Sequence, residues 1–440
     1  MAEFLAALRR IWTAEDLRNR ILTTIALLVL YRFAAHVPVP GVNVDAVRQI
    51  FQQSGGGFLG ILDLLSGGTV SGFSVLAMGV YPYITAQIIL QLLVPIIPRL
   101  QRMMEEDPNQ GREFMERWTY YLAVPMAALN AIGQINILRS FQSSVPIFTF
   151  EIAFNLQTIT MIIAMIGGTM FAIWLGELIS EYGLRKQGLS LIIFAGIVAR
   201  VPSQIGGMLT DEATRWQSLI AFTIIMVLMV FAIVFVQQGR RNVPVMYPGR
   251  RMGNRQSMPV RGNLPLQINM AGMIPIIFAQ SILTFPAIIA QFFTGSTTQW
   301  VADFALGVQN LFGSQSDWYW VLYFIMVVAF TFFYTDVLFT QQNYGENLKK
   351  AGAQIPGVSR GGPTQKYLTK VLRRITLPGA LFLGIVAIMP FLVRGIIPVA
   401  ANLSILSTGL LIVVGVVRDT FFGLDAELKL RGYNDTLLVK

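Results

Sequence analysis

Few side chains in this sequence could take part in acid–base, nucleophilic or metal chemistry. The chain has 440 residues with one histidine and no cysteine, which excludes a His-rich metal site, a thiolate site and a disulfide framework. It contains no Gly-x-x-x-x-Gly-Lys-Ser/Thr, His-Glu-x-x-His or Gly-x-Ser-x-Gly motif. We therefore expect no enzyme activity, no cofactor and no bound metal.

Charged side chains inside the long apolar runs are scarce. The main ones are Arg32, Glu177 and Asp336, and the last two lie near the ends of their runs. A transporter coupled to protons or sodium ions normally needs ionisable groups near the middle of the membrane. Their scarcity disfavours that mechanism, and a secondary transporter of small solutes is kept as the main alternative. Arg32 is interpreted as a pairing residue inside a bundle, and His36 as interfacial.

The composition is that of a membrane protein. The chain is 54% hydrophobic and 13% charged, whereas soluble domains carry about 25% charged residues. Apolar runs of roughly 20 residues are long enough to cross a bilayer as helices, so the fold class predicted is an all-α bundle with ten spans. These spans are expected near residues 21–40, 74–97, 115–135, 153–178, 190–206, 216–238, 270–293, 317–340, 374–393 and 400–417.

The approach to the second span is interrupted. Glycine-rich joints at 55–57 and 67–72 enclose a short apolar piece, residues 58–65, that is too short to cross a bilayer. Backbone that leaves a helix at membrane depth must be buried in protein or line a wet cavity. The stretch predicts a water-facing route with a short element lying in it; a simple re-entrant or interfacial turn is the alternative. A membrane scaffold would explain the loops but not this break.

Loop charges predict the orientation. If the N-terminus is cytoplasmic, 27 of the 33 lysines and arginines fall in cytoplasmic segments and 5 in external ones, with Arg32 inside the first span. Cytoplasmic loops carry this excess of basic residues, so both termini are expected in the cytoplasm. Two cytoplasmic loops, 239–268 and 341–373, are long and basic. They either serve only to orient the chain or dock an acidic partner or RNA.

Ten spans divide into two sets of five. We expect an N-terminal half, residues 1–206, and a C-terminal half, residues 207–440. An odd number of spans per half inverts the second half in the membrane, and inverted halves with a path at their interface recur in transport proteins. This repeat is inferred from topology alone.

Several motifs, spread in order over the whole chain, resemble the SecY family of protein-translocation channels. They are Leu62–Gly68 (LDLLSGG), Tyr81–Leu93 (YPYITAQIILQLL), Ser190–Ile197 (SLIIFAGI), Leu264–Pro275 (LPLQINMAGMIP), Tyr344 with Asn347–Lys350, and Pro356-Gly357. The family's Pro-Gly-Ile/Val-Arg-Pro-Gly pattern is altered here to Pro-Gly-Val-Ser-Arg-Gly, which displaces the arginine by one position, to Arg360.

The resemblance implies an hourglass pore narrowed by a ring of apolar side chains. By motif position these are Ile84, Ile88, Ile193, Ile197, Ile277 and Ile412. Two of the pairs have i, i+4 spacing and so share a helix face. An apolar constriction blocks ions by dewetting and can close around an extended chain of any sequence. Without the resemblance, these would be ordinary isoleucines of membrane helices.

The resemblance also implies a plug, a lateral gate and a docking surface. The plug residues are Phe58, Leu59, Ile61, Leu62, Asp63, Leu64 and Leu65. The gate lies between the second, third, seventh and eighth spans, with polar candidates Thr85, Gln87, Asn130, Asn269 and Gln280; ordinary packing hydrogen bonds are the alternative for these five. The docking residues are Arg240, Arg241, Arg250, Arg251, Arg255, Lys349, Lys350 and Arg360.

The function implied is passage of unfolded polypeptides across the bacterial plasma membrane, and release of membrane helices sideways into lipid. The partners implied by the family are the companion subunits SecE and SecG, the motor ATPase SecA, the ribosome, signal sequences and nascent polypeptides.

The orientation can be tested by labelling from one side. Because the chain lacks cysteine, a cysteine introduced at Gly249 or Gly361 has no background. We expect an impermeant maleimide to label these two positions only from the cytoplasm and a cysteine at Ser296 only from outside. Labelling of positions 249 and 296 from the same side would overturn the predicted topology.

Overall fold

The computed structural model describes most of the chain. The described residues are 12, 14–53, 69–70, 72–140, 147–148, 155–184, 187–210, 215–248, 251–252, 255–256, 260–293, 298–312, 318–396 and 406–430. The predicted plug, residues 58–65, lies outside them.

Each of the ten predicted spans overlaps one long helix of the described chain. These helices are α2 (Glu15–Ala34), α5 (Tyr81–Ile96), α7 (Pro108–Ser140), α8 (Leu156–Tyr182), α9 (Gly188–Thr210), α10 (Arg215–Gln238), α11 (Ile274–Phe293), α13 (Tyr319–Gln342), α15 (Gly362–Ile396) and α16 (Leu406–Leu430). The predicted boundary between the halves, at residue 206, falls inside α9, four residues before its end.

Not all of these helices are uniform apolar rods. By length and composition alone, four described helices could cross a membrane, and α5 with the following helix α6 (Pro98–Glu106) makes a fifth candidate bent by 99°. Other helices have shorter apolar runs, such as Gly188–Val198 in α9 and Ile274–Leu283 in α11. Each of these two helices contains a proline beyond its apolar run, Pro202 in α9 and Pro286 in α11. A proline inside a helix removes a backbone hydrogen bond, which neighbouring groups must replace.

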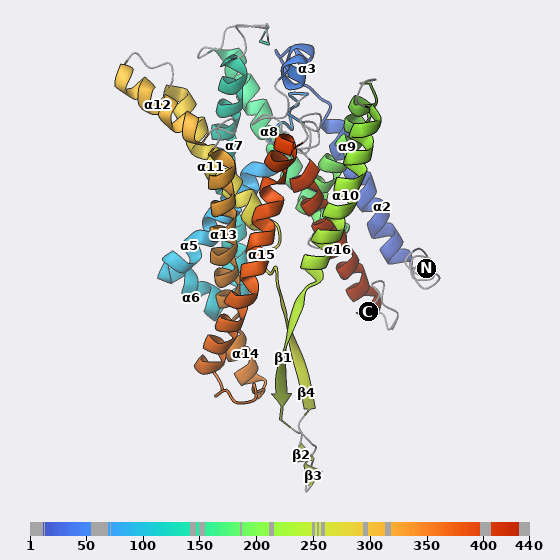
Figure 1. Ribbon diagram of the computed structural model, residues 1–440, viewed down its shortest axis with the longest axis vertical. Coiled ribbons are helices and arrows are strands. Elements are labelled where there is room, and N and C mark those ends of the chain that lie inside the picture. The colour runs from blue at the N-terminus through green and yellow to red at the C-terminus, as the bar shows by residue number, and fades with distance from the viewer. Residues whose placement is uncertain are drawn as a thin grey trace.

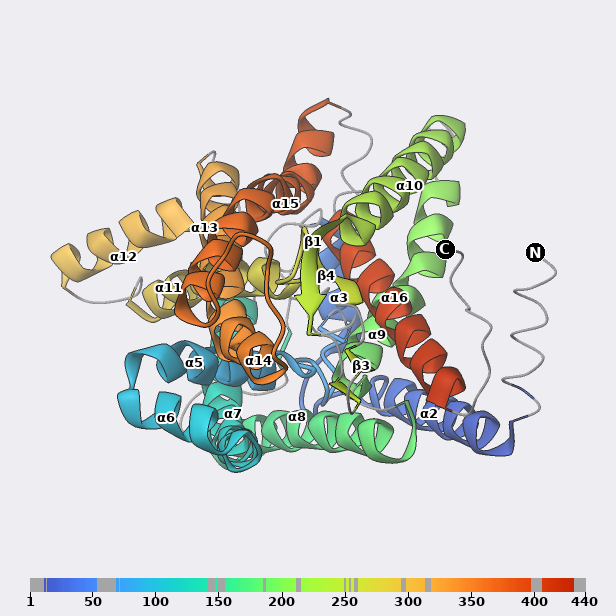
Figure 2. The same ribbon diagram turned by 90° about the horizontal axis from the view of Figure 1, so that it is seen from below.

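Short helices lie at both ends of the bundle. Helices α3 (Val44–Gln53) and α12 (Gln299–Phe312) lie at the upper end in Figure 1, and α14 (Tyr344–Lys350) lies at the lower end beside a β-hairpin. Seen along the bundle, α5, α7, α8 and α2 line one side of the molecule, and α13, α15 and α10 line the other (Figure 2).

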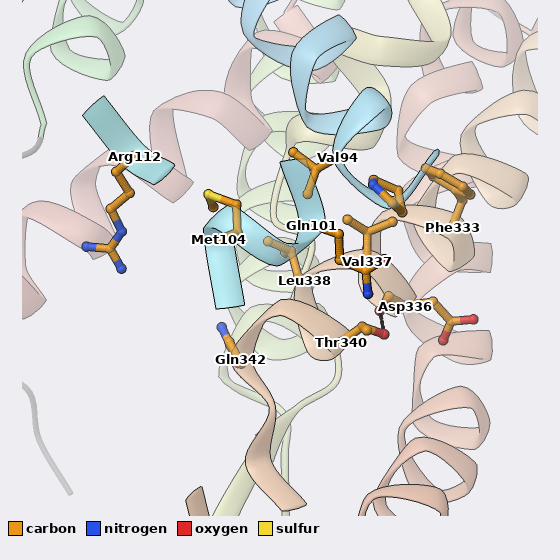
Figure 3. A pocket seen from close by; sticks show the side chains of 11 residues that line it. Val94, Gln101, Met104, Arg112, Phe333, Asp336, Val337, Leu338, Thr340 and Gln342 are labelled. Atoms are coloured by element: carbon orange, nitrogen blue, oxygen red, sulfur yellow. Dashed lines mark hydrogen bonds between the residues drawn. The ribbon is translucent and has the colours of Figure 1, made fainter. Parts of the chain in front are cut away.

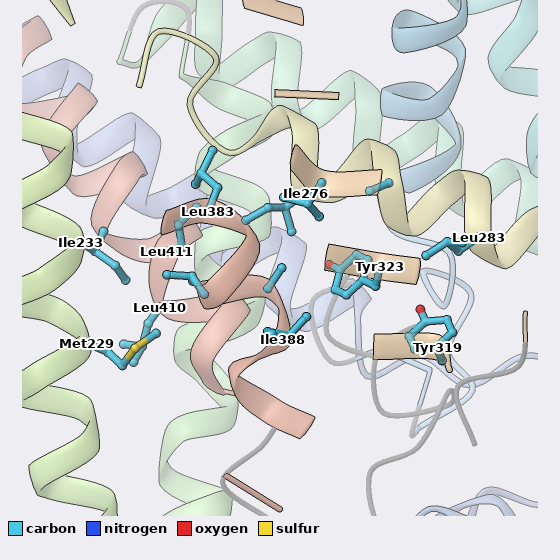
Figure 4. Close-up of a cluster of buried hydrophobic side chains, with 14 of the residues drawn as sticks. Met229, Ile233, Ile276, Leu283, Tyr319, Tyr323, Leu383, Ile388, Leu410 and Leu411 are labelled. Atoms are coloured by element: carbon cyan, nitrogen blue, oxygen red, sulfur yellow. The ribbon is translucent and has the colours of Figure 1, made fainter. Parts of the chain in front are cut away.

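Each side has an apolar core of its own, and a third core joins the two sides. One core draws on α10, α11, α13, α15 and α16, where Ile233, Leu283 and Val327 are fully buried (Figure 4). Another joins α3, residues 70–78, α7 and α8. A third core mixes both sides, because Ile412 and Val416 of α16 pack with Ile193 of α9 and its neighbours. The junction between the two sides is therefore apolar.

The first and last long helices meet at the lower end of the bundle. Leu17 of α2 packs with Leu424 and Leu428 of α16. An ion pair joins Arg20 to Glu427 at 3.1 Å. The described ends of the chain therefore lie against each other, at the same end of the bundle as the hairpin (Figure 1).

The loop 239–268 forms an antiparallel hairpin, which the all-α prediction did not include. Strand β1 (Arg240–Tyr247) pairs with β4 (Val260–Gln267), and β2 (Arg251–Met252) pairs with β3 (Arg255–Gln256) towards the tip. The alternation of buried Val243 and Val245 with exposed neighbours follows the period of a strand. In the sequence, this short strand pattern is interrupted by arginines and prolines, so the loop was not predicted to contain strands.

The hairpin and the loop after α14 form one small domain. An isolated two-stranded hairpin is marginal in water, and here a second loop supports it. Met246 and Gln354 exchange two backbone hydrogen bonds of 2.8 Å. Val243, Val245 and Leu266 of the hairpin share an apolar core with residues of α14 and α15. The two long basic loops are thus one structural unit.

Close helix contact at one glycine offers a test of the packing. A Cβ at Gly168 in α8 would overlap the Val75 carbonyl, whereas one at Gly167 would meet nothing within 4 Å. We expect Gly168→Ala to lower the free energy of unfolding by about 1–3 kcal/mol, as overpacking does. Gly167→Ala is the matched control and should be neutral or stabilising by up to about 1 kcal/mol. Equal effects in a detergent unfolding titration would contradict the contact.

Candidate functional site

The six isoleucines singled out in the sequence come from four helices and meet at the junction of the two sides. Five are buried, with 1–5% of the side chain exposed, and Ile84 is partly buried. Ile193 and Ile197 of α9 pack with Ile412 of α16, and Ile88 of α5 packs with Ile277 of α11.

Two side chains join these clusters into one apolar region. Ile84 packs against both clusters, and so does Met273, just before α11. The i, i+4 spacing of Ile84/Ile88 and Ile193/Ile197 aims each pair at this junction. Contact among branched apolar side chains leaves no polar group to hold water, which is the property of a dewetted barrier.

The segment that follows the predicted plug is pinned against this region. Val39 donates its backbone N–H to Phe73 at 3.0 Å, and Val75 donates to Val37 at 2.9 Å. Leu76 and Val80 pack in the same core as Ile193 and Ile197.

The helix of the second span begins seven residues later than predicted. The expected start was residue 74, but residues 72–80 form turns and α5 begins at Tyr81. Gly79 has φ +52°, a left-handed conformation suited to glycine. Pro82 sits in the first turn of α5, where its missing N–H costs nothing. Backbone groups in the turns bond mainly to one another, as Ala77 does to Ser74 and Gly79 to Leu76, and at Phe73 and Val75 to the chain just after α2.

The polar residues predicted for the gate are largely satisfied within their own segments. Thr85 donates to the Tyr81 carbonyl at 2.9 Å and Asn130 to the Met126 carbonyl at 2.8 Å. Asn269 donates to the Gly272 carbonyl at 3.1 Å, while its buried side-chain oxygen has no hydrogen-bond partner in the described structure. Gln280 is buried and Gln87 half-buried. Within the described residues, the hydrogen bonds of Thr85, Asn130 and Asn269 are therefore local ones.

Other residues make polar contacts across the predicted gate, the seam between α5 and α7 on one side and α11 and α13 on the other. The Tyr334 hydroxyl of α13 donates to Oε1 of Gln91 on α5 at 3.1 Å. The Tyr81 side chain at the start of α5 interacts with Ser281 of α11. Sequence inspection missed these residues; the only signal was that Gln91 lies one turn beyond Gln87 on the same face of α5.

A pocket of about 560 Å³ lies at the hairpin end of the same seam (Figure 3). It is bounded by α5, α6, α7 and α13, with Val94, Met104 and Phe333 among its apolar lining and Arg112 and Asp336 among its charged lining. Asp336 accepts two hydrogen bonds, of 3.1 and 2.7 Å, at one carboxylate oxygen from Arg373 of α15. A pocket lined by both apolar and charged side chains fits a segment that has an apolar body and a polar end.

The basic residues predicted for docking lie on or beside the small domain at the hairpin end. Arg240 and Arg241 begin β1, Lys349 and Lys350 end α14, and Arg360 precedes α15; all five are exposed. Arg240 also lies 5.6 Å from the centre of the Phe422 ring. Arg251 and Arg255 lie in β2 and β3, and Arg250 falls outside the described residues. Within the described chain, no group of three or more His, Asp or Glu side chains is arranged to hold a metal ion.

Comparison with known proteins decides the family. The SecY family model matches residues 74–421. The chain belongs to the SecY family. It is 37% identical to the protein translocase subunit SecY of Streptomyces galbus, with 98% of this chain and 100% of the relative covered. It is 37% identical to the SecY subunit of Aquifex aeolicus, with 98% of this chain and 99% of the relative covered. It is 36% identical to that of Chlamydia trachomatis, with 98% of each chain covered.

Solved SecY-type structures share the fold. A structure described as a protein-conducting channel superposes with a TM-score of 0.61 at 17% identity, covering 94% of this chain and 93% of the other. A second structure, whose description concerns the plug domain of SecY and the membrane seal, superposes with a TM-score of 0.61 at 18% identity. It covers the same shares of the two chains. The predictions of a polytopic helical channel fold and of a SecY-family channel protein rather than an enzyme are confirmed.

The contact between Tyr334 and Gln91 can be measured by a double-mutant cycle. We expect Tyr334→Phe and Gln91→Leu to show a coupling in unfolding free energy of about 0.6 kcal/mol, the average for hydrogen bonds between membrane helices. Tyr323→Phe with Gln91→Leu is the matched control, because Tyr323 lies about 16 Å from Tyr334 along α13. The effects of mutations at separated sites on unfolding free energy are additive. An equally large coupling in the control, or none in the test pair, would contradict a specific hydrogen bond.

Proposed function

We propose that this chain is the channel subunit through which unfolded polypeptides cross the plasma membrane and leave sideways into lipid. The observation that carries the proposal is the convergence of the six isoleucines at the junction of the two sides. Residues 1–206 and 207–440 act as the two inverted halves, and the path runs between them.

The apolar junction is suited to polypeptide because it makes no specific hydrogen bonds. At rest, the isoleucines touch one another and exclude water, so ions meet a dewetted barrier. When a chain enters, the same side chains can move apart and pack on any sequence. Residues 58–65 act as the plug, hinged by the glycines on either side.

The seam formed by α5 and α7 on one side and α11 and α13 on the other acts as the lateral gate. Its polar contacts are few, and hydrogen bonds between membrane helices are weak, about 0.6 kcal/mol each. An apolar signal helix can replace the helix–helix contacts with its own. The pocket beside Val94 and Phe333, at the hairpin end of the seam, offers such a segment an apolar surface.

The driving energy comes from partners. The hairpin and the loop after α14 form a single basic surface, with Arg241, Lys350 and Arg360 exposed on it. We assign this surface to the docking of SecA or of ribosomal RNA and proteins, with Arg360 in the place of the family's loop arginine. SecE and SecG are the expected companion subunits. The hairpin and both termini lie in the cytoplasm of a bacterium in this proposal.

Site-specific crosslinking to a stalled secretory chain tests the proposal. A photoreactive residue at Ile84 or Ile197 should form an adduct with the arrested polypeptide, because both side chains lie at the junction. The matched control is Val227, which is 62% exposed on the outer face of α10 and should give none. A secondary transporter would give no polypeptide adduct at any of the three positions, and adducts at Val227 alone would place the path elsewhere.

A further inference from the structure

Helix α12 presents an apolar stripe that no described part of the protein covers. Trp300 is 75% exposed, Phe304 67% and Leu311 50%. Their spacing of four and seven residues places them within about 40° of one another on a helix of 3.6 residues per turn. Trp300 and Phe304 stack, with ring centres 6.3 Å apart.

The rest of α12 is divided into two other faces. One face is turned towards the bundle: Ala305 is 2% exposed, and Phe312 packs against the core of α10, α11, α13, α15 and α16. The third face carries the polar residues Gln299, Asp303 and Asn310, all exposed, together with one exposed apolar residue, Leu306. The stripe lies between the packed face and the polar face, which is the arrangement of a helix that lies in a membrane surface.

The position of α12 places this stripe at the boundary of the membrane. Helices α10 and α13 both end next to the hairpin domain, so their first residues mark the opposite end of the bundle. Exposed tryptophans lie at the start of both helices: Trp216 and Trp320 in the first turns of α10 and α13, and Trp318 directly before α13. Tryptophan is enriched where a membrane meets water, so these side chains mark the level at which α12 leaves the bundle.

The neighbouring helix α11 also carries an exposed apolar face. Ile282, Ile289 and Phe293 of α11 lie on one face and are 36–50% exposed. Five residues separate Phe293 from α12. Since α11 is a span of the channel, this face meets lipid, and α12, the next described helix, extends sideways from the bundle (Figures 1 and 2).

We propose that α12 is a membrane-surface helix whose stripe of Trp300, Phe304 and Leu311 lies in the lipid leaflet at the end of the bundle opposite the hairpin. The helix contains no lysine or arginine, so its attachment depends on apolar and aromatic side chains and not on anionic headgroups. The occupant of the stripe is phospholipid at the level of the headgroups and upper acyl chains.

One consequence concerns the gate. Helix α11 carries Ile277 and lies at the seam, and α12 anchors its far end in lipid. Movement of α11 during opening would therefore drag α12 through the leaflet. This consequence rests on the proposed function, whereas the contact of α12 with lipid requires only that α11 and α13 cross the membrane.

Spin labels on single cysteines test the lipid contact. The chain has no native cysteine, and labels at Trp300, Phe304 and Leu311 are compared with labels at Gln299, Asp303 and Asn310 on the same helix. In liposomes of neutral phospholipid, we expect collisions with oxygen to exceed those with a water-soluble nickel chelate at the stripe, and the reverse at the polar positions. Equal access of the chelate to both sets would overturn the proposal.

A second measurement separates lipid from a protein partner. A fluorophore at Phe304→Cys should be quenched by phospholipids brominated near the headgroup more strongly than by those brominated near the chain ends, and Asp303→Cys should be quenched by neither. The same result is expected with and without anionic lipid. A label at 304 that is shielded from the chelate but not quenched by brominated lipid would show that protein covers the stripe, and would overturn the proposal. Neither readout requires transport, so a failed transport assay leaves this result intact.

Discussion

Backbone hydrogen bonding in a medium without water is the constraint on which this structure depends. A peptide group left unpaired in lipid costs several kcal/mol, so the chain crosses the membrane as helices. Where the helices stop, the backbone finds other partners. Residues 72–80 leave the helical path and pair with the chain that leaves α2: Phe73 accepts a hydrogen bond from Val39, and Val75 donates one to Val37. The interruption lies inside protein, next to the apolar junction, where such backbone is permitted.

The junction is held by apolar contacts and the seam by few polar ones, and both can separate without breaking many hydrogen bonds. At the junction, isoleucines from four helices touch without hydrogen bonds, so separating them breaks no specific pairing. At the seam, the polar side chains largely bond to carbonyls of their own segment, as Thr85 and Asn130 do. Few bonds therefore have to break when the two sides separate. Both arrangements favour a path that opens for many sequences.

The domain at the hairpin end shows how separate loops can become one surface. The hairpin alone has two strands and little core of its own. Its Val243 and Val245 are buried in a core to which α13, α14, α15 and the segment around Ile355 also contribute. Basic side chains from both loops are held on one rigid unit, which is a better docking surface than two independent loops because less conformational freedom is lost on binding.

The sequence by itself determined the family, the ten helical spans, the break before the second span and the isoleucines of the junction. These features depend on local hydrophobicity and on motifs of a few residues, which are visible without knowing what lies nearby. Tertiary structure alone decided the start of α5 at Tyr81, the hairpin in the loop 239–268, the union of the two basic loops and the bond between Tyr334 and Gln91. Each depends on partners far apart in the chain: Val75 bonds to Val37, Met246 to Gln354, and Tyr334 to a residue 243 positions away. The hydrogen-bond partner of a polar residue such as Asn130 could not be predicted from sequence, since a side chain on a helix can equally reach its own backbone or a neighbour.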